Sequence, residues 1–180
     1  MISSTRIDQQ ETIKLLQTLD LTRLVPGNII QFGMSLEGPV KTMAQRTSGW
    51  GKSFYIIDTF EQDDPHDIIR TFQHYPHVSF IRSPTGELLQ KITKDPVSFV
   101  NIDMSSGFPL LQVLEHLDNY LSQLGLIFLN GVTEGEMLEL SRFIEETPNH
   151  YDTLTLDTGT QTLLRRLNEH GQGLWTDPNH

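Results

Sequence analysis

A glycine-containing turn followed by a distant aspartate is the pattern in this sequence best suited to bind a ligand. Residues 28–40, NIIQFGMSLEGPV, predict a buried strand, a turn with Gly33 and Gly38, and the start of a helix. Asp58 ends the next predicted strand, about 25 residues further on. A glycine turn lets the backbone approach a ligand closely, and an acidic side chain at that strand end is placed to accept hydrogen bonds from two ribose hydroxyls. Gly33 and Asp58 therefore predict a nucleoside-binding site.

The elements that must position these residues alternate between strands and helices. The strand candidates are rich in Ile, Val and Phe, and the central ones are apolar on both faces, which is typical of strands covered by helices on both sides. The alternation predicts an α/β fold, a single doubly wound, mostly parallel sheet with helices on both faces. The predicted strands are 28–32, 53–58, 78–82, 97–103, 126–131 and 153–157, and the predicted helices are 7–20, 39–47, 65–74, 84–93, 109–124 and 134–146.

The clearest helix signal lies at 109–124, which begins with Pro109, carries a leucine-rich stripe and stops at Gly125. The tail predicts a short helix over 160–171 and an edge strand over 173–176. The chain length of 180 residues suits a single domain. We expect an N-terminal helical segment at 1–27, a core at 28–146 and a C-terminal extension at 147–180.

Composition narrows the possible partners. The 13 basic residues against 23 acidic ones give a net charge of −10, which repels phosphate backbones and predicts that nucleic acid is not a partner. The absence of cysteine excludes disulfides, thiolate nucleophiles and thiolate-bound metals. No apolar run approaches the length of a membrane span, and the N-terminus lacks the order of a signal peptide. We therefore expect a cytoplasmic protein that does not bind membranes.

The order of these motifs resembles the class I, Rossmann-like, S-adenosylmethionine-dependent methyltransferases. The similarity covers roughly 25–146 and is nearest to the small O-methyltransferases of the macrocin type. The best match is Asp58-Thr59-Phe60-Glu61 at the end of the second strand, and VSFVNID, a long amphipathic helix and LIFLNG follow in the family's order. The resemblance implies S-adenosylmethionine as cofactor and a small-molecule substrate, with O-methylation as the reaction. The cofactor-binding residues that it implies are Gly33, Gly38, Asp58, Thr59, Phe60 and Asp103.

The sequence also departs from the family's pattern. Gln31 stands where the family has an acidic residue that helps to organise the methionine end of the cofactor, and Glu37 replaces a glycine. Metal-dependent members hold a divalent cation with carboxylates after the fourth and fifth strands. Ser105 and Asn130 stand at two of those positions, and one carboxylate with one amide makes a poor magnesium site. The sequence therefore predicts no metal site.

Two interpretations of the function remain open at this stage. In the first, the chain transfers a methyl group, and Asp103 or His150 is the base that removes the proton of the acceptor hydroxyl. Asp103 equally fits a cap on the turn that follows its strand. In the second, the chain is a catalytically degenerate relative that acts as a binding or partner subunit. The short segment before the first strand makes a homodimer or a partner protein possible in either case.

Overall fold

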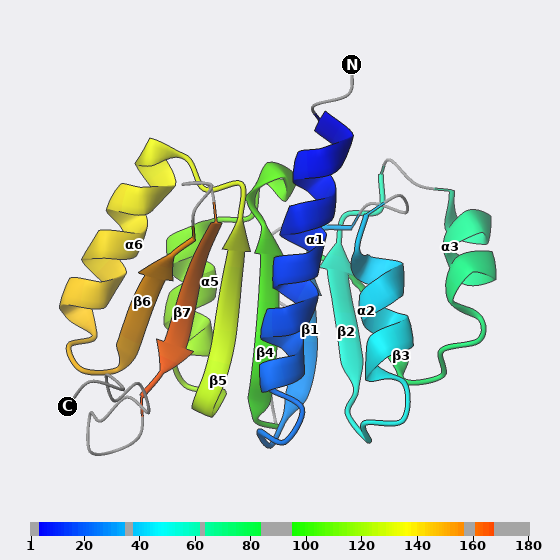
Figure 1. Cartoon of the computed structure of the whole chain (residues 1–180), viewed down its shortest axis with the longest axis horizontal. Helices are drawn as coiled ribbons and strands as arrows, with labels where there is room; N and C mark the ends of the chain where they lie inside the picture. Colours follow the sequence, from blue (N-terminus) through cyan, green and yellow to red (C-terminus); the bar gives the residue numbers. More distant parts are fainter. Residues whose placement is uncertain (1–3, 35–37, 62–63, 84–94, 157–160, 168–180) are drawn as a thin grey trace.

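The chain folds around one seven-stranded sheet (Figure 1). The computed structural model describes residues 4–34, 38–61, 64–83, 95–156 and 161–167. The strands are β1 (Asn28–Phe32), β2 (Phe54–Asp58), β3 (Val78–Arg82), β4 (Val97–Asp103), β5 (Leu121–Asn130), β6 (Tyr151–Thr155) and β7 (Gln161–Arg166). The helices are α1 (Ser4–Leu21), α2 (Val40–Thr47), α3 (Pro65–Phe72), α5 (Leu110–Leu117) and α6 (Glu134–Glu146), with a 3₁₀ turn, η1, at Met104–Ser106.

The strand order confirms the predicted doubly wound sheet. It is β3-β2-β1-β4-β5-β7-β6, and every pair among the first five strands in that order is parallel. Only β7 runs against its neighbours β5 and β6. The chain builds outward from β1 in one direction and from β4 in the other, so strand order reverses between these two strands. That reversal is where sheets of this kind bind ligands.

Helices cover both faces of the sheet, as the apolar central strands predict. Alternate residues of β1 point to opposite faces, so Ile29 belongs to the buried cluster that includes side chains of α1, α2 and α3, whereas Ile30 belongs to the cluster that includes those of α5 and α6. Figure 1 shows α1 and α2 in front of the sheet and α5 behind it. Within the described ranges, no helix is long and apolar enough to cross a membrane.

The predicted helix at 109–124 is wrong in its second half. Helix α5 ends at Leu117, and β5 begins at Leu121, where it pairs with Val97 of β4. Gly125 is therefore a buried residue inside a strand instead of a helix terminator. The pairing shifts register between Val97 and Phe99, and Leu124 adopts a positive φ of 63°. With this irregularity, the first residues of β5 pair with β4 as a strand, although their apolar residues are spaced as in a helix.

The predicted helix at 160–171 is also wrong, because 161–166 form β7. This strand lies between β5 and β6, and its side chains contact apolar groups on both faces of the sheet. A leucine pair in such an interior strand buries one member on each face, so the sequence has no simple strand alternation. The predicted helix at 84–93 and edge strand at 173–176 lie outside the described residues.

Lys52 stabilises the amino edge of the sheet through the hydrogen bonds that its side chain donates. Its ammonium group donates to the carbonyl oxygens of Thr22 and Val25 and to Ser98 Oγ, the first and last at 2.8 Å. Ser98 Oγ in turn donates to the carbonyl oxygen of Gly27. One side chain thus joins the connection between α1 and β1 to β4. Burial lowers the pKa of Lys52 to about 8.

We predict that Lys52→Met destabilises the protein by about 1–3 kcal/mol at pH 7, because three acceptors lose their donor. The unfolded chain holds the Lys52 proton up to its ordinary pKa of 10.5, whereas the folded chain releases it near pH 8. Between these values the unfolded state binds more protons, so wild-type stability rises with pH relative to the variant. Urea unfolding at pH 7.5 and 9.5 measures both effects. Lys41→Met on the exposed side of α2 is the control. An equal loss of stability in the two variants would show that the three hydrogen bonds of Lys52 do not stabilise the fold.

Candidate functional site

The turns that follow β1, β2 and β4 meet at the carboxyl edge of the sheet. Strand β1 lies between β2 and β4, and Phe32 pairs with Ile57 on one side and Ile102 on the other. The residues next in sequence therefore arrive together at this edge, beside the reversal of strand order. They include Gly33, Asp58 and Asp103, three of the residues that the sequence predicts for the site.

Asp58 joins the ends of β1 and β2. Its Oδ2 accepts a hydrogen bond of 2.6 Å from the backbone N–H of Met34, and its Oδ1 accepts one of 2.8 Å from that of Phe60. Phe60 has a positive φ of 54°, so the turn after β2 is strained to bring its N–H to the carboxylate. Each carboxylate oxygen has two lone pairs, and Asp58 is only half-buried. It can still accept hydrogen bonds from a ligand's hydroxyls.

Gly33 is required by the chain's own packing. Its φ is 79°, and a Cβ built there would lie 2.7 Å from Ser106 Cβ and 3.3 Å from Asp103 Cβ. The turn after β1 therefore packs directly against the turn after β4. The packing against Ser106 is thus sufficient to require a glycine at this position, and the approach of a ligand to the Gly33 backbone stays a prediction.

Asp103 caps the turn that follows β4. Its Oδ1 accepts hydrogen bonds from the backbone N–H and from the hydroxyl of Ser105, at 3.0 and 2.7 Å. It is thus the N-cap of η1. Within the described part of the chain, Oδ2 accepts no hydrogen bond. The capping interpretation is therefore correct for one oxygen, and the other oxygen is available to a ligand.

Gln31 belongs to a buried amide pair that sequence reasoning missed. Its Nε2 donates to the carbonyl oxygens of Phe32 and Gly33, at 3.0 and 2.8 Å, and its Oε1 accepts from Asn101 Nδ2 at 2.7 Å. Two carbonyl neighbours fix which end of the amide carries the nitrogen, so the orientation of Asn101 follows. Oδ1 of Asn101 is then buried without a hydrogen-bond partner among the described residues. Two amides in otherwise apolar strands were the available signal, since buried amides pair.

The remaining predicted residues occupy different surroundings. Thr59 Oγ1 lies 3.4 Å from Asp58 Oδ1, and the ring of Phe60 packs edge-on against Phe80 with centroids 5.9 Å apart. Gly38 precedes α2, and residues 35–37, which include Glu37, lie outside the described residues. Asn130 accepts a hydrogen bond of 3.1 Å from Gln161 Nε2. In the portion of the chain that the structure describes, no three His, Asp or Glu side chains gather in a way that would hold a metal ion.

His150 does not join the other predicted residues. It precedes β6, whose first residue, Tyr151, pairs with Arg166 at the end of β7. Because β7 runs downward in Figure 1, this places His150 at the amino edge, opposite Asp103. There its Nδ1 lies 3.3 Å from Asp118 Oδ1, which also accepts hydrogen bonds from Tyr151 and Arg166. His150 therefore forms part of a polar cluster that holds the β6–β7 hairpin to the end of α5.

Comparison with known proteins identifies the fold. No family model matches the sequence, and no curated protein resembles it significantly. Among solved structures, CalS11, a TDP-rhamnose 3′-O-methyltransferase of calicheamicin biosynthesis, matches with a TM-score of 0.70 and 16% identity over 87% of this chain and 79% of its own. The O-methyltransferase NovP matches with a TM-score of 0.67 and 13% identity over 86% and 80%. A precorrin-6y C5,15-methyltransferase from Geobacter metallireducens matches at 0.60 and 16% over 85% and 87%.

The chain therefore has the class I methyltransferase fold, the Rossmann-like α/β architecture that its motifs resemble. At these identities the similarity establishes the architecture, and the functional interpretation depends on the site itself.

We predict that Gln31→Glu destabilises the protein by roughly 2 kcal/mol or more, because a carboxylate would face two carbonyl oxygens where an amide now donates. The loss grows as pH rises and the buried carboxyl group ionises. Thermal unfolding at pH 5 and pH 8 measures it. Gln45→Glu, the same change on the exposed side of α2, is the control. Equal stability of the two variants would show that the amide pair does not hold the turn.

Proposed function

We propose that this protein binds S-adenosylmethionine at the carboxyl edge of the sheet and transfers its methyl group to a hydroxyl of a small molecule. The observation that carries the proposal is the position of Asp58. It ends β2, which lies beside β1 and one strand from the reversal of strand order, and its carboxylate accepts a hydrogen bond of 2.6 Å from the Met34 N–H of the glycine turn. A ribose diol presents two neighbouring donors, which a carboxylate at this position can accept. The class I methyltransferase fold of the chain supports the same cofactor.

The described residues suit the nucleoside end of this cofactor. Asp58 would bind the ribose, and Thr59 and Phe60 would line the path beside it. At the methionine end, Gln31 would offer the cofactor no free hydrogen-bonding group. Its amide points into the sheet, where it donates to the carbonyl oxygens of Phe32 and Gly33 and accepts from Asn101. When bound, S-adenosylmethionine supplies an electrophilic methyl group on a sulfonium sulfur.

Asp103 is our candidate for the base. Methylation of a hydroxyl joins the acceptor oxygen to the methyl carbon as the carbon–sulfur bond breaks, and the hydroxyl proton must leave. Oδ1 of Asp103 is held by Ser105, which fixes the orientation of the carboxylate, and Oδ2 is left to accept the proton. His150 is excluded from this role because it lies at the opposite edge of the sheet.

The acceptor is proposed only as a small molecule. The structurally similar proteins carry names that refer to a TDP-sugar and to a precorrin, so their common fold does not select one acceptor. The net charge of −10 argues against a nucleic-acid acceptor.

The second candidate is a binding or partner subunit without catalysis. Two observations favour it: Gln31 stands in a buried amide pair, and one oxygen of Asp103 is used to cap η1. In this second candidate, the polar groups at the carboxyl edge hydrogen-bond to one another and stabilise the turns. The edge would then bind a ligand or a partner protein without catalysing a reaction. The two candidates differ in whether S-adenosylmethionine binds.

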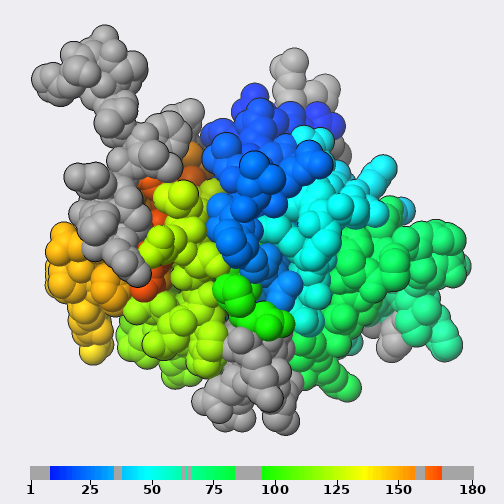
Figure 2. Space-filling model, turned by 90° about the horizontal axis from the view of Figure 1, so that it is seen from below, coloured from blue at the N-terminus to red at the C-terminus, as the bar shows by residue number. Residues whose placement is uncertain are grey.

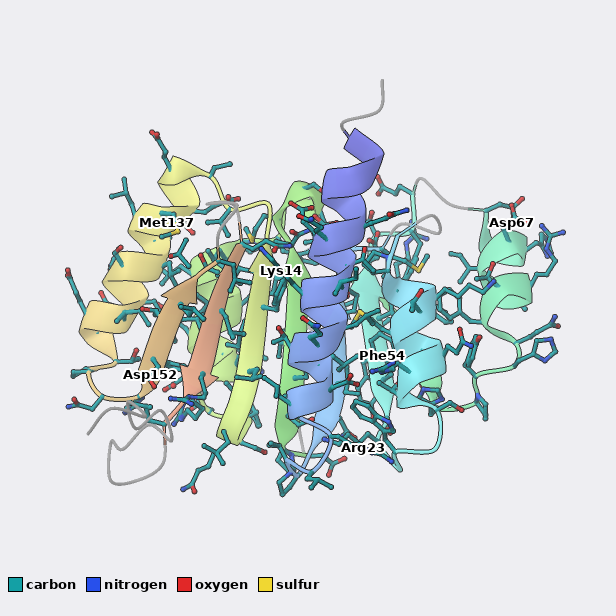
Figure 3. All side chains as sticks on the ribbon, viewed as in Figure 1. Lys14, Arg23, Phe54, Asp67, Met137 and Asp152 are labelled. Atoms are coloured by element: carbon teal, nitrogen blue, oxygen red, sulfur yellow. The ribbon has the colours of Figure 1, made fainter. Side chains whose placement is uncertain are left out.

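We predict that S-adenosylhomocysteine and S-adenosylmethionine bind with micromolar affinity in isothermal titration calorimetry, and that Asp58→Asn weakens both by about tenfold or more. Asparagine keeps the size of the side chain and one acceptor oxygen but removes the charge. Asp67→Asn is the matched control, since Asp67 lies on α3, at the outer end of the sheet (Figure 3). Thermal unfolding of both variants separates a binding defect from a folding defect.

The absence of binding at millimolar ligand would overturn the methyltransferase proposal and favour the partner-subunit interpretation. An equal loss of affinity in the two variants would show that the cofactor does not bind at Asp58. Binding that requires Asp58, followed by transfer of a labelled methyl group to hydroxylated small molecules and its loss in Asp103→Asn, would establish the activity.

A further inference from the structure

An apolar groove of about 580 Å³ lies on the α1 face of the sheet, away from the carboxyl edge. Leu21, at the end of α1, forms one wall, and Leu124 and Leu126 of β5 lie beside it. Leu154 of β6 and Leu163 of β7 continue the surface, and Arg165 lies at its end. Figure 2, seen from the amino edge, shows α1 and β5 side by side, and the contacts between these two elements agree.

The groove exists because α1 covers only part of this face. Leu163 pairs with Leu154 in the neighbouring strand, so both side chains point to the same side of the sheet. Within the described residues, no helix packs over β6 and β7 on that side. As a result Leu154 and Leu21 are 54% and 66% exposed. An apolar surface of this kind on a folded chain indicates a binding surface.

We infer that this groove binds the segment that follows β7, residues 168–180, through Leu174 and Trp175. The chain leaves β7 at the groove, because Arg165 lines it and Leu167 comes two residues later. The segment NEHGQGLWTDPNH contains one adjacent pair of large apolar side chains, and it is this pair. The six residues 168–173 reach about 20 Å when extended, which exceeds the roughly 10 Å from β7 across two neighbouring strands.

Two physical arguments favour this segment over a second copy of the chain. A segment attached beside its own site is present there at an effective concentration on the order of millimolar, so weak contacts suffice. Two copies would each bring a net charge of −10 to the contact, and this repulsion opposes association. The groove lies on the amino half of the sheet, so the inference does not depend on the proposed cofactor site.

Trp175 provides a direct test. The chain has only two tryptophans, so Trp50→Phe leaves Trp175 as the single reporter in an otherwise complete protein. We expect its emission to be shifted to the blue relative to the urea-unfolded chain, and its quenching by acrylamide to be about threefold weaker, because a docked indole is removed from water. Leu154→Glu in the same background is expected to restore quenching towards the unfolded value.

The matched control is Leu138→Glu, the same change of charge at a 74% exposed leucine on α6. It is expected to leave the quenching of Trp175 unchanged. Sedimentation of each variant as a monomer at every concentration would support docking within one chain. The inference would be overturned if Trp175 were quenched as strongly as in the unfolded chain, or if Leu154→Glu and Leu138→Glu changed its quenching equally. It would also be overturned if Trp175 were protected only when sedimentation shows a dimer.

Discussion

The close packing of the turns after β1 and β4 is the constraint on which the candidate site depends. Gly33 lies against Ser106 with no room for a side chain, and its φ of 79° is one that residues with a side chain rarely adopt, so the turn after β1 requires a glycine at this point. Polar contacts then hold the bend from two sides. The Gln31 amide binds the carbonyl groups of Phe32 and Gly33 from within the sheet, and the Asp58 carboxylate binds Met34 N–H from β2. A ligand at this edge would meet a preformed surface with few groups left to reorganise.

The two edges of the sheet have different physical roles. The carboxyl edge presents carboxylate oxygens that are only partly used, on Asp58 and Asp103, and these can interact with a ligand. At the amino edge the charged groups satisfy one another or the backbone. Lys52 binds three acceptors, and Asp118 accepts from the side chains of Tyr151 and Arg166. Burial and the neighbouring Asp118 carboxylate raise the pKa of Tyr151, so this cluster keeps the phenol neutral and serves stability.

The methyltransferase fold of this chain occurs together with a buried amide pair close to the carboxyl edge. Core packing holds the strands of the sheet in place, whereas the function of such a fold depends on the groups at its strand ends. Gln31 is a clear case, since its amide is buried at the end of β1 and accepts a hydrogen bond from Asn101.

The sequence by itself determined the alternation of strands and helices, the mostly parallel sheet, and the arrival of Gly33, Asp58 and Asp103 at one edge, because apolar runs and strand ends are local signals. It did not determine the end of α5 or the existence of β7, since a leucine stripe suits a helix or an interior strand until a neighbour such as β4 is present. The position of His150 and the pairing of Gln31 with Asn101 were also decided only in three dimensions. These contacts join residues distant in sequence, and the order and direction of the strands bring them together.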